Sequence, residues 1–113
     1  MKTEETTHGL RSIFKLIAAF RALEPDMPMT QAICFIWVAL NEGHTQVELR
    51  QALGMPSATS SRNLSALSKV HRLGKLGLNL IEWVENPEDR RAKMLYLTPR
   101  GKHTVATLLD TIR

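Results

Sequence analysis

Residues 45–73, TQVELRQALGMPSATSSRNLSALSKVHRL, decide the fold. Thr45 and Glu48 have the spacing of a capping box, in which each side chain bonds an exposed backbone N–H of a new helix. We therefore expect a short helix over 46–53, which Gly54 can end because glycine adopts left-handed backbone angles at low cost. After Met55-Pro56, a second helix is expected from Ser57 to about Leu73. Two helices joined by such a short turn are typical of a helix-turn-helix unit.

The second helix of this unit has a predicted inner and a predicted outer face. The residues expected to face the core are Ser60, Leu64, Leu67 and His71. The residues expected to face outward are Ala58, Thr59, Arg62, Ser65 and Lys69. In the short first helix, the residues expected to face inward are Val47, Leu49, Ala52 and Leu53.

A β-hairpin is expected directly after the unit, because the apolar period changes from 3.6 to 2. Strands are predicted over 80–85 and 93–97, joined by the polar tip 86–91, NPEDRR. Thr98 followed by Pro99 is a strong start signal for a last helix over 99–112. A hairpin over 78–98 that follows a helix-turn-helix over 45–73 forms a wing, and the fold class is a winged helix-turn-helix, mainly α with a small β-hairpin.

Two further helices are expected before the unit. Apolar residues at helical spacing predict an amphipathic helix over 8–23, which the Pro25 and Pro28 segment ends. Residues 31–41 are apolar almost all round and predict a central core helix, with Thr30 as its N-cap. Cys34 lies in this helix and is interpreted as a core cysteine, because a redox-active thiol needs an exposed, electropositive setting.

Composition limits the class of protein. The 113 residues suit one domain over 1–113, and the single cysteine excludes an intramolecular disulfide framework. No apolar run is long enough to span a membrane and the N-terminus shows no signal peptide, so we expect a cytoplasmic protein. The formal net charge is +4, and residues 50–81 contain five basic residues and no acid. The four histidines lack metal-ligand spacing, and neither paired acids nor a glycine loop for phosphate occurs, so we expect no metal, no cofactor and no enzyme activity.

Residues 86–102 of the hairpin region read NPEDRRAKMLYLTPRGK. This stretch resembles the wing of the MarR family of winged-helix transcription regulators, whose pattern is D-P-x-D-R-R followed by a strand and L-T-x-x-G. PadR-type regulators share the ending over 96–101, and Asp89-Arg90-Arg91 favours the MarR family. Asn86 replaces the first aspartate of the pattern, and the sequence looks like a short variant, phage- or plasmid-sized, without the family's last helix.

Two regions are candidates for contact with double-stranded DNA. Short hydroxyl side chains and an arginine near the start of a recognition helix suit base edges in the major groove. Arginines at a hairpin tip suit a minor groove or phosphates. The predicted DNA-binding residues are Ser57, Thr59, Ser61, Arg62, Ser65, Lys69, Arg90 and Arg91. The resemblance implies that Asp89 supports the wing arginines by hydrogen bonding. The alternative for each residue is an ordinary solvated surface.

The first and last helices carry apolar stripes that suit a homodimer, the state that the resemblance also implies. The predicted dimerisation residues are Leu10, Ile13, Phe14, Ile17, Val105, Leu108, Leu109 and Ile112. The predicted function is a homodimeric transcriptional regulator, in the plainest case a repressor, that binds an inverted-repeat DNA site. The alternative is a winged-helix adaptor or inhibitor that binds a protein. A small-molecule effector is conceivable from the family but nothing in the sequence supports it.

Overall fold

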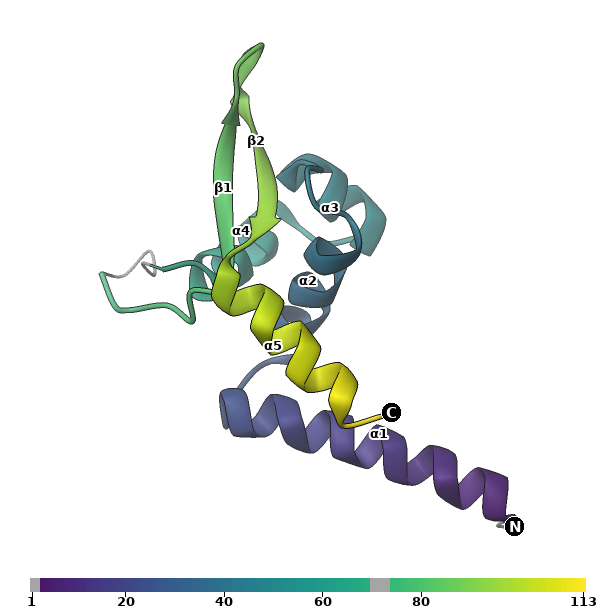
Figure 1. Ribbon diagram of the computed structural model, residues 1–113. Helices are drawn as coiled ribbons and strands as arrows, with labels where there is room; N and C mark the ends of the chain where they lie inside the picture. The colour runs from purple at the N-terminus through teal and green to yellow at the C-terminus, as the bar shows by residue number, and fades with distance from the viewer. Residues whose placement is uncertain (1–2, 70–73) are drawn as a thin grey trace.

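The computed structural model describes residues 3–69 and 74–113, and for residues 90 and 91 it describes the backbone alone. The elements in chain order are α1 (Glu4–Leu23), α2 (Met29–Leu40), α3 (Gln46–Leu53), α4 (Ser57–Leu67), β1 (Ile81–Asn86), β2 (Asp89–Leu97) and α5 (Pro99–Asp110). This is the predicted winged helix-turn-helix, mainly helical with one antiparallel hairpin (Figure 1).

The hydrophobic core lies between α2, α4 and the base of the hairpin. Phe35 and Val38 of α2, Leu64 of α4 and Leu95 of β2 are fully buried. The chain has principal extents of 53 × 27 × 24 Å, with the wing projecting at one end and α1 lying across the other, beside α5 (Figure 1). None of the helices in the described residues is long and apolar enough to cross a membrane.

The start of α3 is the capping box that the sequence predicts. The Thr45 hydroxyl accepts a hydrogen bond from the Glu48 backbone N–H at 3.2 Å, and the Glu48 carboxylate accepts one from the Thr45 N–H at 3.1 Å. The backbone bond to Thr45, followed by the His44 side chain at 2.7 Å, holds the pKa of the Glu48 carboxyl below its usual value. Gly54 ends α3 at a φ of 59°, in the left-handed conformation. Both ends of α3 are therefore confirmed.

Replacing Thr45 with alanine should lower the free energy of unfolding by about 1 kcal/mol, because the Glu48 N–H loses its acceptor. Urea unfolding followed by circular dichroism measures this loss. The matched control is Thr107→Ala, since the Thr107 hydroxyl is exposed and bonds only to the His103 carbonyl of its own helix. An equal loss in both variants would show that the capping bond adds nothing specific.

The helix α4 is shorter than predicted. It ends at Leu67 rather than near Leu73, and the part of the prediction over 70–73, with His71, lies outside the described residues. The chain returns along the end of α4, where Gly77, Leu78 and Leu80 donate backbone hydrogen bonds of 2.8–3.0 Å to the carbonyls of residues 69, 66 and 67. These bonds cap the helix end from a distant segment. The predicted inner residues Ser60, Leu64 and Leu67 are all buried.

The first two helices begin earlier than predicted. Thr3 caps α1, which starts at Glu4 rather than near residue 8. The N-cap of α2 is Pro28, and the predicted cap, Thr30, lies inside the helix, where its hydroxyl donates to the Asn63 side-chain oxygen at 3.4 Å. Proline fixes φ at this entry, and the Pro28 carbonyl accepts the Gln31 N–H at 3.0 Å, while no side chain caps the first turn. Cys34 is fully buried, as predicted.

The wing has a tighter tip than the sequence suggested. Asn86 pairs with Asp89, so only Pro87 and Glu88 form the turn, and Arg90 and Arg91 belong to the backbone of β2. The connection before α3 pairs with the outer edge of β2. The Leu95 N–H donates to the His44 carbonyl, and the Gly43 N–H donates to the Leu95 carbonyl, both at 2.8 Å. These two hydrogen bonds join the wing to the start of α3.

The start of α5 is as predicted, with Thr98 as N-cap and Pro99 in the first turn. The Thr98 hydroxyl accepts from the Gly101 N–H at 2.9 Å and donates to the Asn79 carbonyl at 2.7 Å. The helix therefore begins against the segment that enters the wing.

Candidate nucleic-acid interface

The first half of α4 presents polar side chains to solvent. Ser57, Ser61 and Arg62 are exposed and Thr59 is half-buried. Pro56 sets the entry to the helix and no side chain caps its first turn. The main-chain N–H groups of that turn are therefore free to bind an anion or a base edge. The first half of α4 is therefore open to solvent, as predicted, and its contact with DNA stays a prediction.

The second half of α4 differs from the prediction. Ser65 is 8% exposed, so the expectation that it faces outward is wrong, because the returning segment 77–80 bonds to the C-terminal turn and encloses it. Lys69 is exposed but follows the end of the helix. Asn63 is a buried polar residue that the sequence reasoning missed: its amide donates to the Thr59 carbonyl at 2.9 Å. Its spacing from Ser60 and Leu67 along one helical stripe is the signal that could have revealed it.

The wing places the Asp89-Arg90-Arg91 segment at the end of the hairpin that projects from the body (Figure 1). The turn is closed by the Glu88 N–H, which donates to the Asn86 side chain at 3.0 Å. Asn86 thus supplies a side-chain oxygen acceptor to the turn. Asp89 is exposed. Its support of the wing arginines stays a prediction, because their side chains are outside the described part of the chain.

The described basic residues around α4, namely Arg62, Lys69 and Lys75, make no ion pair with another described residue. Within the described residues, the ion pairs are His44–Glu48 at 2.7 Å and Arg113–Asp110 at 3.4 Å, and neither involves the acid-free stretch 50–81. Arg62, Lys69 and Lys75 are exposed. The surface around α4 therefore carries a positive field suited to a polyanion.

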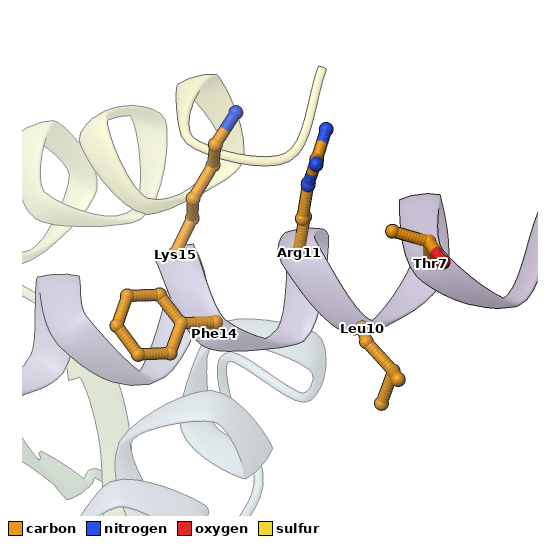
Figure 2. A pocket seen from close by; sticks show the side chains of 5 residues that line it. All are labelled: Thr7, Leu10, Arg11, Phe14 and Lys15. Carbon is orange, nitrogen blue, oxygen red and sulfur yellow. The ribbon is translucent and has the colours of Figure 1, made fainter. Parts of the chain in front are cut away.

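The outer face of α1 is apolar and unpartnered. Leu10, Ile13, Phe14 and Ile17 are 50%, 56%, 74% and 55% exposed, respectively. Figure 2 shows Leu10 and Phe14 on a different side of α1 from Arg11 and Lys15. The helix has no buried residue of its own, which is unusual for so apolar a helix.

The stripe on α5 is divided between the core and the surface. Leu109 and Ile112 are about 40% exposed, at 41% and 40%. Leu108 is only 4% exposed and belongs to the hydrophobic core, so its predicted place on a dimer surface is wrong. Val105 is partly buried against the same core. Val105 and Leu108 face inward because α5 packs on α1 and on the base of the wing.

Cys34, Trp37 and Trp83 lie in or against the hydrophobic core. Cys34 contacts Met55, with 3.7 Å between the sulfur atoms, and burial raises the pKa of its thiol to about 11. Trp37 and Trp83 are partly buried and both pack against the core. In residues 3–69 and 74–113, no three histidine, cysteine or acidic side chains gather where they could hold a metal ion.

These features define a winged-helix protein with an exposed recognition-type helix. No family model matches the sequence, and no curated protein matches it significantly. Solved structures place the fold more narrowly, since the chain has the fold of the MarR-type transcriptional regulators, as the wing motif suggested.

Three solved structures illustrate this similarity. A MarR crystal structure is 24% identical with a TM-score of 0.64, and the match covers 91% of this chain and 72% of MarR. MepR from S. aureus, solved with DNA, is 20% identical with a TM-score of 0.71, over 93% and 70% of the two chains. CouR, described as a transcriptional repressor bound to a 23-mer DNA duplex, is 21% identical with a TM-score of 0.67, over 97% and 72%.

Proposed function

We propose that the protein binds specific double-stranded DNA and regulates transcription, acting as a homodimeric repressor that covers an inverted-repeat site. The observation that carries this proposal is the exposed first half of α4 beside a projecting wing. A recognition helix contacts base edges with residues of its N-terminal part, and that is the part of α4 left open to solvent. DNA-bound structures of similar fold, those of MepR and CouR, add support.

The residues proposed to contact DNA divide by position. Arg62 is suited to a bidentate contact with guanine, and Ser57, Thr59 and Ser61 to base edges or phosphates at the start of α4. Lys69, Lys75, Arg90 and Arg91 are proposed to meet the phosphates or the minor groove. Ser65 is left out because it is buried.

The homodimer is supported by the apolar face of α1. A small domain seldom leaves four large apolar side chains of one helix in water, and a second copy would cover them about a two-fold axis. Leu109 and Ile112 on the neighbouring α5 would extend this interface. Two copies of α4 related by a two-fold axis then require a DNA site with the same symmetry, an inverted repeat with half-sites about one helical turn apart or multiples of it.

Selection from a random duplex pool at about physiological salt, followed by sequencing of the retained DNA, tests the proposal. An enriched inverted repeat is the expected result. Retention without enrichment would restrict the function to binding of the DNA backbone. No retention would overturn the proposal and favour the protein-binding adaptor.

Replacing Arg62 with alanine should weaken binding to the selected site by about 1–3 kcal/mol and relax the preference at one base pair of each half-site, because a bidentate base contact is lost. Fluorescence anisotropy with the selected site and single-base variants measures both effects. Arg100→Ala is the matched control, since Arg100 is exposed on α5 and is not among the residues proposed to contact DNA. Unchanged discrimination between the sites would show that Arg62 reads no base.

A further inference from the structure

A groove of about 300 Å³ lies between the recognition unit and the wing. It is bounded by the start of α3, the first residue of α4 and the edge of β2. The residues that line it are Thr45, Gln46, Val47, Arg50, Ser57, Ala92 and Lys93. Three elements that are separate in sequence therefore meet at one opening, which we call the joint groove.

The joint groove is cationic. Arg50 comes from α3 and Lys93 from β2, and within the described residues neither makes an ion pair. Two carboxylates could neutralise these cations: Glu48 is close to Arg50 in sequence, and Glu85 is opposite Lys93 in the strand register. The Glu48 carboxylate is engaged by Thr45 and His44, and Glu85, opposite Lys93 across the hairpin, is not among the ion-paired residues in the described part of the chain. The remaining lining is neutral and includes hydrogen-bond donors on Thr45, Gln46 and Ser57.

The fold holds these elements in fixed relation. Gln46 and Arg50 are four residues apart on α3 and so lie on one side of the helix. Thr45 bridges to Met94, the neighbour of Lys93, which ties the start of α3 to the edge of β2. The two cations are therefore positioned by the same backbone connection rather than by a flexible loop.

The geometry of DNA indicates which part of a bound duplex would lie in the joint groove. A major groove and the adjoining minor groove are separated by one sugar-phosphate strand. A protein with a helix in one groove and a hairpin in the other must straddle that strand. The joint groove lies between α4 and the wing, the two elements assigned to those grooves under the proposed function.

We propose that the joint groove binds one backbone phosphate of the DNA strand that runs between the recognition helix and the wing, with Arg50 and Lys93 as its shared cationic partners. This inference rests on the proposed function and adds a phosphate site at residues outside α4 and the wing tip. Since both cations neutralise the same phosphate, their contributions are coupled. Replacing both residues should therefore lower the number of phosphates that contribute to the salt dependence of binding by about one rather than two.

The test uses the full chain with Arg50→Gln, Lys93→Gln and the double variant, which keep much of each side-chain stem. Affinity for a duplex is measured by anisotropy from about 50 to 200 mM salt. We expect the double variant to bind about tenfold more weakly and its slope of log K against log salt to fall by about 0.9. The effects of the single variants should not add. The matched control is Arg100→Gln with Lys102→Gln, the same charge change on exposed residues at the start of α5 that are assigned neither to DNA contact nor to the dimer interface.

The outcomes separate this inference from the proposed function. Wild-type protein that binds no duplex overturns both. Wild-type binding with unchanged affinity and slope in the double variant overturns the phosphate site alone. Additive effects with a slope change of about 1.8 would mean two phosphates and overturn the shared site. Inorganic phosphate at matched ionic strength should compete no better than chloride. Saturable competition that the double variant abolishes would assign the groove to a free anion instead.

Discussion

Phe14→Asp is expected to turn the proposed homodimer into a monomer. Phe14 is 74% exposed on α1, so the change should cost the fold of one protomer little. At a dimer interface, loss of a central aromatic side chain costs about 2 kcal/mol or more, and burying a carboxylate there adds to it. A two-fold interface holds the residue twice, so the dimer dissociation constant should rise by about 100- to 1,000-fold.

Sedimentation velocity over a range of protein concentrations measures this change. Binding to an inverted repeat should weaken in parallel, while binding to a single half-site should stay the same. The matched control is Leu40→Asp, because Leu40 is 77% exposed at the end of α2, away from the α1 face. A wild-type protein that is monomeric at all concentrations, or a Phe14→Asp variant that still dimerises, would contradict the proposed interface.

Gly101→Ala is expected to cause a large loss of stability, although it adds only one methyl group. A Cβ atom at this buried position would lie 2.0 Å from the Leu80 carbonyl oxygen, a backbone atom that cannot turn aside. That carbonyl also accepts the Thr98 N–H at 3.0 Å, so moving it disturbs both the α5 cap and the entry to the wing. We expect a loss of about 3 kcal/mol, which corresponds to a fall in Tm of roughly 10–20 °C.

Thermal unfolding followed by circular dichroism checks this expectation. Gly9→Ala is the matched control: Gly9 lies inside α1 and an added Cβ meets nothing within 4 Å. That change should stabilise the protein by about 0.5–1 kcal/mol, since alanine forms helix more readily than glycine. Equal Tm values for the two variants would show that α5 does not approach Leu80 as closely as described.

Elements whose ends depend on neighbouring residues could be predicted from the sequence. The Thr45–Glu48 box, the Gly54 stop and the Thr98-Pro99 start are local, because each bond joins groups within three or four residues. The winged fold then followed from the order of these elements. The wing motif over 86–102 pointed to MarR-type regulators, whose fold the chain has.

Features that depend on distant segments could not be predicted. The end of α4 at Leu67 is made by hydrogen bonds from residues 77–80, and no period within α4 signals them. The same segment buries Ser65. Leu108 carries the same helical spacing as Leu109, and only the packing of α5 decides which of the two lies in the core.

The candidate site shows the same division. The exposure of Ser57, Ser61 and Arg62 follows from amphipathic spacing, which the sequence contains. The meeting of Arg50 with Lys93 does not, because they are 43 positions apart (93 minus 50) and are brought together by the bridge between Thr45 and Met94. A pair of this kind becomes evident only once the pairing of strands is known.

The buried thiol of Cys34 allows local opening of the folded protein to be measured by thiol labelling. The thiolate is the form that alkylating reagents attack, and with a pKa near 11 and no solvent exposure the folded state supplies almost none of it. Labelling therefore proceeds through openings that part α2 from its neighbours. The labelling rate, with and without duplex DNA, gives the free energy of those openings at a single natural site, without an introduced probe.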